Sequence, residues 1–396
     1  MMHLFLNCLA ASAGSGLTYV RNVVPQLAAR PELRATLALT PQLRDGLGHP
    51  HNISFLEMEM PAGAAGRFCW EQSRLPRIIR ESGADVLISA GNFALWQSPV
   101  PQILLSGNSL YTSPDFRRDL RARGAYGIWL DTRIRAFFAR RSVRWADCTV
   151  APSEAFADAL RQWTGSDVIS LYHGFDPEIF FNNEARLPSA IQDKINSGKN
   201  PLRLIFVSHY NYYRNFETLL RALPYIQERL GSRSVQLFLT CKLSSEEDSG
   251  SYRAESAAAL VRCLGISDHV VELGAVPYHL LQHLLRASDI YVTPAYAETF
   301  AHPLVEAMAC GLPVVASDLP VHREICGNAA VYFSRFSPQM LADGVLQLEQ
   351  SAALRKKLVD CALRRSGEFS WRNHVDRILT LAHSLKRSKI RYPRAA

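Results

Sequence analysis

The sequence predicts an α/β protein with the fold class of two doubly wound, Rossmann-like domains, each built on a parallel sheet. Strand-like apolar runs alternate with helix-like runs along the chain, and the alternation begins again after residue 200. Such alternation produces parallel strands joined by crossover helices. The length of 396 residues also exceeds what one hydrophobic core usually supports.

The expected elements follow from this alternation. In the first half we expect a helix at 16–29 and strands at Leu4–Leu9, Asp85–Ile88, Ile103–Leu105 and Cys148–Ala151. In the second half we expect strands at Leu202–Val207, Val235–Thr240, Val270–Leu273, Ile290–Thr293 and Pro313–Ala316, and helices at 216–230, 252–264, 278–287 and 303–310. A polar stretch with proline and glycine separates the halves. We therefore expect a first domain at 1–183, a linker at 184–200, a second domain at 201–370, and a crossover helix with a basic tail at 371–396.

Composition indicates an ordinary folded protein, with 48% hydrophobic and 20% charged residues. The eight cysteines are scattered, and no spacing suggests zinc, so we expect reduced thiols and no metal site. The N-terminus imitates a secretion signal, but it has no Lys or Arg before its apolar run, and Asn7 interrupts that run. We therefore expect a buried strand there and a cytoplasmic protein.

Charge is concentrated in two places. The net charge is +8, yet 117–144 holds nine arginines against two aspartates (9 − 2 = +7), and the tail Lys386–Arg394 adds five positive charges. Trp129, Phe137 and Phe138 lie within the first cluster. Three readings stay open: a solvated helix face, contact with an anionic membrane surface, or an anionic lipid-linked substrate. We expect no nucleic acid, because no binding motif accompanies the charge.

The most informative segment is Pro294–Asp318, which contains Glu298 and Glu306. Pro294 ends the strand before it, Pro303 suits the first turn of a helix, and Gly311 suits its end. The backbone amides near Ala301 to Leu304 would then lie at a helix N-terminus, where an anion such as a diphosphate binds. The carboxylates could accept hydrogen bonds from sugar or ribose hydroxyls. The alternative is a surface loop with an acid that supports its own helix.

Three further segments follow strand ends. Ser208, His209 and Arg214 form a loop in which Arg214 could clamp a phosphate, or simply face solvent near a helix cap. Gly16 lies in a glycine turn that could approach a ligand or serve strand–helix packing. His173 and Asp176 lie in the fourth segment, Leu171–Pro177, where a structural role is favoured over a functional one for each residue taken alone.

Together these segments resemble the family 4 nucleotide-sugar glycosyltransferases, which have the two-domain fold called GT-B. The family's Glu-x7-Glu signature is matched at Glu298 and Glu306, and its Glu-Ala-Met-Ala-Cys-Gly-x-Pro-Val-Val-Ala-Ser-Asp run at 306–318. His173-Gly-Phe-Asp176 is similar to the family's His-Gly-Val-Asp, and Phe369-Ser-Trp371 to the Phe-Ser-Trp before its last helix. The resemblance spans nearly the whole chain.

The resemblance implies a role for each matched residue. Glu306 would hold the donor ribose, and Glu298 and Arg214 would be the catalytic residues at the transferred sugar and the phosphates. The other donor-binding residues would be Gly16, Ser208, His209, Val276, Phe300, Ala301, His302, Pro303 and Leu304. The base would lie against Gly274–Tyr278. The family retains anomeric configuration, and its members of this kind need no metal, in agreement with the lack of an Asp-x-Asp triplet.

Some positions depart from the family pattern. Its Glu-Gly-Phe-Gly is Glu298-Thr-Phe-Ala301 here, so bulkier residues crowd the sugar pocket. His209 replaces a cation of the phosphate loop and would be charged only with a raised pKa. A histidine common in the first domain is absent, and Asn108 or Ser109 stands in its place. Asn108 and His173 are therefore the candidate acceptor-side residues.

The sequence favours a retaining hexosyltransferase, with mannose a mild preference, that uses a GDP- or UDP-linked sugar and no cofactor. We expect a glycan or lipid-linked acceptor in cell-surface polysaccharide synthesis, with peripheral contact to the inner face of the cytoplasmic membrane. Two alternatives stay open: a non-catalytic nucleotide-sugar binding protein, suggested by the absent histidine, and a nucleotide-sugar epimerase of the same fold.

Overall fold

The computed structural model describes residues 1–11, 14–61, 63–181, 185–243 and 252–391, with backbone alone at 14, 15, 179 and 389–391. The chain divides into two compact units. We call Met1–Thr112, Leu130–Gly174 and Ser370–Ala396 the N unit, and Ser113–Trp129 and Phe175–Phe369 the C unit. Arg394 of the basic tail and Glu184 of the expected linker lie outside the described residues.

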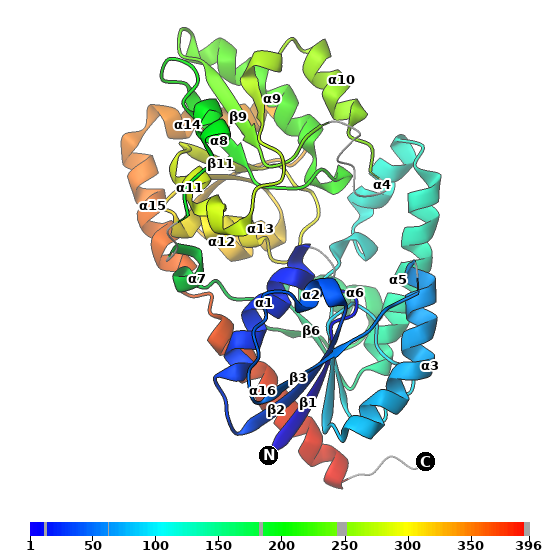
Figure 1. Ribbon diagram of the computed structural model, residues 1–396. Helices are drawn as coiled ribbons and strands as arrows, with labels where there is room; N and C mark the ends of the chain where they lie inside the picture. Colours follow the sequence, from blue (N-terminus) through cyan, green and yellow to red (C-terminus); the bar gives the residue numbers. More distant parts are fainter. Residues whose placement is uncertain (12–13, 62, 182–184, 244–251, 392–396) are drawn as a thin grey trace. The chain divides into compact units, whose positions relative to one another are not determined.

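The N unit contains a seven-stranded parallel sheet in the order β3-β2-β1-β4-β5-β6-β7, of which Figure 1 labels β1, β2, β3 and β6. Its strands are β1 (Met2–Asn7), β2 (Leu33–Leu39), β3 (Ile53–Glu57), β4 (Val86–Ser89), β5 (Gln102–Leu105), β6 (Cys148–Ala151) and β7 (Ile169–Ser170). Every residue of β1 is buried, and the strand pairs with β2 on one side and β4 on the other. The signal-like N-terminus therefore forms a buried interior strand, as its interrupted apolar run predicts.

Helices cover this sheet and give the unit its core. They are α1 (Gly14–Ala28), α2 (Pro41–Arg44), α3 (Ala64–Ser82), α5 (Tyr126–Trp145, whose first residues belong to the C unit), α6 (Glu154–Thr164) and α16 (Trp371–Arg391), with a 3₁₀ turn η1 (Ser109–Tyr111). The C-terminal helix α16 joins the core through Trp371, Val375, Ile378 and Ala382. Their spacing of four, three and four residues puts them on one face of the helix.

The C unit contains a six-stranded parallel sheet in the order β10-β9-β8-β11-β12-β13. Its strands are β8 (Leu202–Phe206), β9 (Val235–Leu239), β10 (Val270–Glu272), β11 (Ile290–Thr293), β12 (Val314–Ser317) and β13 (Ala330–Phe333). Most residues of β8, β9, β11 and β12 are buried and apolar, which is the pattern of strands covered on both faces, while the edge strand β10 is half-buried.

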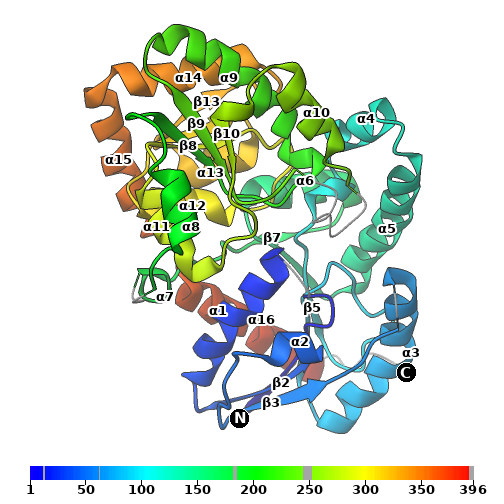
Figure 2. The ribbon, with the colours of Figure 1, turned by 45° about the horizontal axis from the view of Figure 1, so that its top comes forward.

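The helices of the C unit are mostly short, and α9 and α14 pack side by side (Figure 2). They are α4 (Pro114–Ala122), α7 (Pro177–Phe181), α8 (Ser189–Ile195), α9 (Phe216–Leu230), α10 (Glu255–Cys263), α11 (Leu281–Arg286), α12 (His302–Ala309), α13 (Pro320–Cys326), α14 (Pro338–Gln350) and α15 (Ala352–Ser366). The 3₁₀ turns are η2 (Tyr212–Arg214), η4 (Ser267–His269) and η5 (Tyr278–Leu280). Gly311, with φ +68°, follows α12 and ends it, as its position in the sequence suggests.

The structure differs from the sequence-based organisation in two respects. The boundary between the units falls between Gly174 and Phe175, and the segment expected as a linker contains helix α8. The segment Ser113–Trp129 belongs to the C unit although it lies within the first half of the chain. Strands β2, β3, β7 and β13 were not among the expected strands, because short apolar runs do not reveal by themselves whether they pair.

Strand order reverses once in each sheet. In the N unit the chain builds outward from β1 to β3 and then returns to β4 on the other side of β1. In the C unit the same happens between β8 and β11. The loops after two such neighbouring strands diverge to opposite faces, and the opening at their carboxyl ends is where ligands bind in this type of sheet.

Within the described part of the chain, no helix has both the length and the apolar run required to cross a bilayer.

Gly174 provides a test of how α16 is attached to its unit. A Cβ atom built on Gly174 would lie 2.0 Å from the backbone nitrogen of Trp371 and 2.5 Å from its Cα atom. Backbone cannot move aside as a flexible side chain can, so we expect Gly174→Ala to destabilise the N unit by about 3 kcal/mol. Thermal unfolding measures this.

The matched control is Gly127→Ala. Gly127 is exposed in α5, and a Cβ atom there would meet nothing within 4 Å. We expect this change to raise the stability slightly, because alanine favours helix more than glycine does. An unchanged melting temperature in Gly174→Ala would contradict the close packing.

Candidate functional site

Two loops meet at the reversal point of the C-unit sheet. Strands β8 and β11 are hydrogen-bonded neighbours, with Ile290 opposite Leu204 and Tyr291 opposite Ile205. The chain after β8 forms η2, which ends at Arg214, and the chain after β11 carries Glu298. Arg214 Nη1 and Glu298 Oε2 form a salt bridge, so two residues 84 positions apart in sequence are brought together.

This salt bridge is largely shielded from solvent, with side-chain exposures of 23% for Arg214 and 11% for Glu298. Burial works to raise the pKa of Glu298, but Arg214 and the Thr299 N–H outweigh it and hold that pKa below its usual value. Burial likewise opposes the charge of Arg214, while Glu298 raises the pKa of the guanidinium. Both groups are therefore ionised. Arg214 Nε is buried without a hydrogen-bond partner among the described residues.

Asn215 fixes the loop that carries Arg214. Its backbone is left-handed, with φ +58° and ψ +45°, a conformation that asparagine tolerates better than most residues. Its side-chain Nδ2 donates to Pro294 O at 3.0 Å and to Arg335 O at 2.6 Å. The amide thus ties the loop after β8 to the loop after β11 and positions both members of the salt bridge.

The segment containing α4 is tied to the same region of the C unit. Arg335 donates from Nε and Nη2 to Asp115, at 2.8 and 2.6 Å, and Asp115 is buried. Tyr296, two residues before Glu298, donates its hydroxyl proton to Asp119 at 2.6 Å. Arg123 links Asp119 at 2.9 Å with Glu217 at 2.8 Å. Arg123, expected in a surface patch, is therefore committed to an internal ion pair.

Glu306 lies inside α12, with 4% of its surface exposed. Burial raises its pKa to about 7, and the hydrogen bond donated by the Tyr278 hydroxyl counteracts part of that shift. Tyr278 begins η5, in the loop where the sequence places the base. The resemblance placed Tyr278 beside the base, but its contact with Glu306 was not predicted, because only the fold brings the two residues together.

His322 is a second side chain that the sequence did not indicate. It is fully buried in α13, and its Nδ1 lies 3.0 Å from both Ser317 Oγ and Ser317 O. Burial lowers its pKa to about 4, although Glu298 acts in the opposite direction, so the imidazole is neutral. Its Nε2 finds no hydrogen-bond partner among the described residues.

The start of α12 offers fewer anion donors than the sequence suggested. Pro303 has no amide proton, and the Leu304 N–H donates to Ala301 O at 2.9 Å. The side chains of Phe300, Ala301 and Leu304 are buried, and the Phe300 ring packs against His302 with 4.9 Å between centroids. Only backbone groups of these three residues can reach a ligand. Ala301 has φ +64°, a conformation that favours glycine.

The remaining C-unit candidates lie on the loops after β8 and β10. Ser208 is half-buried, donates its N–H to Thr240 Oγ1 at 3.0 Å and its hydroxyl to His209 O at 2.8 Å. His209 is exposed, and Val276 is half-buried. Ser208 therefore supports the loop, while His209 is free to turn toward solvent or a ligand.

The N-unit candidates take part mainly in internal packing. A Cβ atom on Gly16 would lie 3.0 Å from Ala11 Cα, so this glycine permits close contact between loop and helix. Asn108 Oδ1 accepts from Leu110 N at 3.0 Å and caps η1. His173 stacks on Trp371, with ring centroids 5.3 Å apart, and contacts Tyr19 as well.

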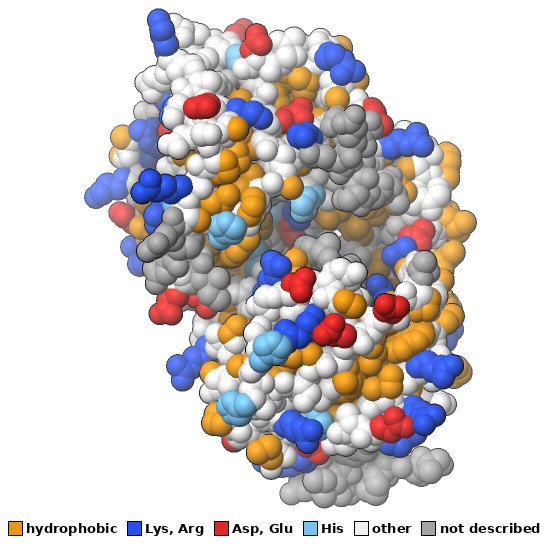
Figure 3. Space-filling view, in the orientation of Figure 1, with side chains coloured by type: hydrophobic (Ala, Val, Ile, Leu, Met, Phe, Trp, Pro, Cys, Tyr) orange, Lys and Arg blue, Asp and Glu red, His pale blue; other side chains and the backbone are white. Residues whose placement is uncertain are grey.

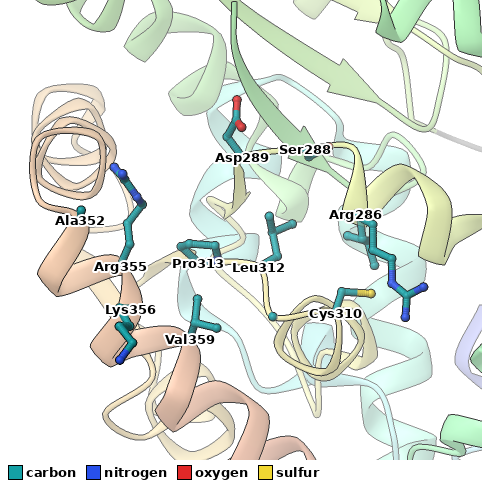
Figure 4. A pocket seen from close by; sticks show the side chains of 12 residues that line it. Arg286, Ser288, Asp289, Cys310, Leu312, Pro313, Ala352, Arg355, Lys356 and Val359 are labelled. Carbon is teal, nitrogen blue, oxygen red and sulfur yellow. The ribbon is translucent and has the colours of Figure 1, made fainter.

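A separate cavity of about 490 Å³ opens beyond the C-terminal end of α12. Leu312, Pro313 and Val359 line its apolar part, with Arg355 and Lys356 on the α15 side (Figure 4). None of the predicted site residues lines it. Arg355 is already bonded to Leu348 O and Glu349 O, at 2.6 and 2.7 Å, so the cavity shows no set of polar groups directed at a ligand.

Among the described residues, no group of three or more His, Cys, Asp or Glu side chains could hold a metal ion.

Two Rossmann-like parallel-sheet units, each with a strand-order reversal, are the architecture of the GT-B fold. Two family models match consecutive parts of the chain: "Glycosyltransferase Family 4" over 18–179 and "Glycosyl transferases group 1" over 189–365. They cover 162 and 177 residues, or 339 of 396 together. The chain belongs to this glycosyltransferase family, and the fold class predicted from the sequence is confirmed.

Similar proteins agree with this assignment. The phosphatidyl-myo-inositol mannosyltransferase of Mycobacterium tuberculosis is 29% identical over 229 residues, which is 55% of each chain. Sucrose-phosphate synthase from Thermosynechococcus elongatus has a TM-score of 0.77 at 16% identity, covering 98% of this chain and 100% of that one. Anabaena HepE in complex with UDP-glucose has a TM-score of 0.73 at 18% identity, covering 97% and 100%.

The chain spans only part of the length of its curated relatives. The matched region covers 55% of the mannosyltransferase and 39% of the D-inositol 3-phosphate glycosyltransferase of Corynebacterium diphtheriae, to which it is 29% identical over 171 residues, 42% of this chain.

Glu306 predicts a pH-dependent stability. Its folded pKa of about 7 lies above the ordinary 4.5, so the protonated carboxyl favours the folded state. That contribution is complete below pH 4.5 and is lost as the pH rises toward 7, at a total of roughly 3 kcal/mol. Glutamine does not titrate, so Glu306→Gln does not lose this contribution as the pH rises. The free energy of unfolding of the variant, compared with that of the unchanged protein, should therefore be more favourable at pH 8 than at pH 5. Urea unfolding at both values measures this.

The control for this experiment is Glu255→Gln, which changes an exposed acid at the start of α10. Its pH profile should follow that of the unchanged protein. Parallel profiles for Glu306→Gln and the unchanged protein would show that Glu306 is not held protonated by burial.

Ala301 predicts a stabilising substitution. A left-handed conformation costs an alanine about 1 kcal/mol or more, which glycine avoids. Glycine loses more chain entropy on folding, so we expect Ala301→Gly to stabilise the C unit by up to about 1 kcal/mol. Ala258→Gly, inside α10, is the matched control and should destabilise by about 1 kcal/mol. A lower melting temperature in Ala301→Gly would contradict the strain.

Proposed function

We propose that this protein is a retaining, metal-independent hexosyltransferase that takes its sugar from a GDP- or UDP-linked donor bound to the C unit. The observation that carries the proposal is the Arg214–Glu298 salt bridge at the reversal point of the sheet. One N–H of Arg214 holds Glu298, while its buried Nε–H has no partner among the residues that the structure describes. A buried unpaired donor on a cation is costly unless a ligand completes it, and a diphosphate oxygen is the suitable acceptor.

Each side chain then has a part in the reaction. Glu306 would accept hydrogen bonds from the ribose hydroxyls in place of the one from Tyr278, and ionised Glu298 would accept them from the hexose. The bond between the anomeric carbon and the phosphate oxygen breaks, and the acceptor oxygen bonds to the same face of that carbon. The leaving phosphate takes the acceptor proton, and Arg214 stabilises its charge. No protein nucleophile and no cofactor is required.

The comparisons support the substrate classes. A structural neighbour binds UDP-glucose, which suits a nucleotide-sugar donor, and a relative is named as a mannosyltransferase acting on phosphatidyl-myo-inositol. We therefore propose a glycan or lipid-linked acceptor, with mannose as the preferred sugar, in cell-surface polysaccharide synthesis. Such an acceptor would place the protein at the inner face of the cytoplasmic membrane.

The proposal predicts that Glu298→Gln and Arg214→Ala each reduce turnover about 100-fold or more, because each removes a charge that faces the reacting groups. Thermal-shift screening against GDP-mannose and UDP-hexoses first identifies the donor, since a ligand that binds the folded state raises the melting temperature. Transfer to a panel of glycan acceptors then measures turnover, and the anomeric configuration of the product reports retention.

Glu349→Gln is the matched control, because Glu349 forms a comparably shielded ion pair with Arg233 elsewhere in the C unit. It should lower stability and leave turnover intact. Donor binding without transfer would instead indicate a binding protein, and an isomerised donor without acceptor would indicate an epimerase. Full turnover in both site variants would overturn the assignment of the site.

A further inference from the structure

Helix α5 carries a row of large apolar side chains on its solvent face. Leu130, Ile134 and Phe137 are 55%, 51% and 53% exposed. Their spacing of four and three residues puts them on one face of the helix. Single exposed apolar residues are ordinary, but a contiguous row is typical of a surface that contacts another body.

The opposite face of α5 is the one that packs against the N unit. Ala139, Ser142 and Val143 are buried, so the helix attaches to the N unit through small residues. Phe138 is half-buried and packs on Phe68, with 5.0 Å between ring centroids. The large apolar residues on the outer face are not members of the buried core of the unit. About half of their apolar surface stays in water, at a cost to solubility.

A tryptophan extends the apolar row beyond the helix. Trp96 is 68% exposed and stacks on Trp145, the last residue of α5, with ring centroids 6.3 Å apart. Tryptophan is enriched at the interface between lipid and water, where its ring lies at headgroup level. Figure 3 shows hydrophobic and basic side chains mixed on the side of the N unit where Figure 1 draws α3 and α5.

Arginines accompany the row along the same helix. Arg133, Arg140, Arg141 and Arg144 are exposed, and Arg141 lies over the Phe137 ring at 4.6 Å. Helix α5 holds five arginines and one aspartate, a net charge of 5 − 1 = +4. The aspartate, Asp131, is paired with Arg135 at 2.8 Å. The partner of this face must therefore be anionic.

We infer that the outer face of α5, with Trp96, binds the surface of an anionic phospholipid bilayer. An interfacial helix of this kind buries its apolar residues at the acyl boundary while its arginines meet the lipid phosphates. A second copy of the chain would bring two faces of charge +4 together, which opposes self-association. Nucleic acid would satisfy the arginines but not an aliphatic row. The membrane contact would hold the transferase near a lipid-linked acceptor. The inference therefore rests on the proposed function.

This surface is the later part of the arginine cluster that the sequence indicated at 117–144. Arg123 is bound to Asp119 and Glu217, and Arg118 lies 3.4 Å from Asp115. Arg121 lies over the Trp129 ring at 5.3 Å. The earlier part of the cluster thus has partners within the C unit, and the exposed combination of charge and apolar surface lies at 130–144.

The experiment measures sedimentation of the full chain with vesicles of phosphatidylglycerol and phosphatidylcholine in equal amounts, and with phosphatidylcholine alone. We expect binding to the anionic vesicles that weakens with salt but does not vanish, because the apolar row adds a salt-insensitive part. The triple variant Leu130→Ser, Ile134→Ser, Phe137→Ser should lose about 100-fold in affinity. The double variant Arg140→Gln, Arg141→Gln should lose about 30-fold.

Matched controls change exposed residues of the C unit. Met340→Ser with Leu363→Ser, at exposures of 48% and 47%, and Arg221→Gln with Arg262→Gln should bind as the unchanged protein does. Turnover with a water-soluble acceptor should persist in all α5 variants, so a failed site assignment and a failed membrane contact are distinguishable. Equal binding to both vesicles, or no binding, would overturn the inference. Dimers that the serine variants dissociate, or preference for RNA over vesicles, would overturn it too.

Discussion

The candidate site depends on the pairing of β8 with β11. Parallel pairing puts the carboxyl ends of both strands at one edge of the sheet, and only there can Arg214 reach Glu298. Neither charge would be tolerated alone at that depth, because an unpaired buried ion costs several kcal/mol. The two loops are therefore mutually dependent, and the bridging amide of Asn215 ties them a second time.

The same salt bridge explains how a charged site can remain ready for a ligand. Glu298 neutralises Arg214 without saturating it, because a guanidinium has five N–H groups in a fixed plane. The Nε–H, which has no partner among the described residues, is then a preformed donor whose orientation is already fixed. Tyr278 plays the same part at Glu306. Its hydroxyl donates a hydrogen bond to the buried carboxyl, and a ligand hydroxyl could donate the same bond equally well. Both acids are thus held by internal partners in the described structure.

Much of this architecture could be predicted from local sequence. Pro303 and Gly311 mark the ends of α12, and the apolar runs at 202–207 and 290–293 mark the two central strands. Contacts between distant segments could not be predicted, because no local pattern encodes them. Asp119 and Tyr296 are 177 residues apart, and the membership of α4 in the C unit rests on such pairs. His322 escaped notice for the same reason.

The departures from the family pattern gain a physical meaning in this setting. Ala301 holds a left-handed conformation that glycine would adopt without strain, and Phe300 is wedged between His302 and Phe369. The strained residue is fixed by its neighbours, as strained residues at functional sites generally are. The backbone beside Glu298 is consequently held by packing rather than by glycine flexibility. A narrower range of hexose shapes should fit against it, and donor selectivity would then reside in Thr299, Ala301 and His302.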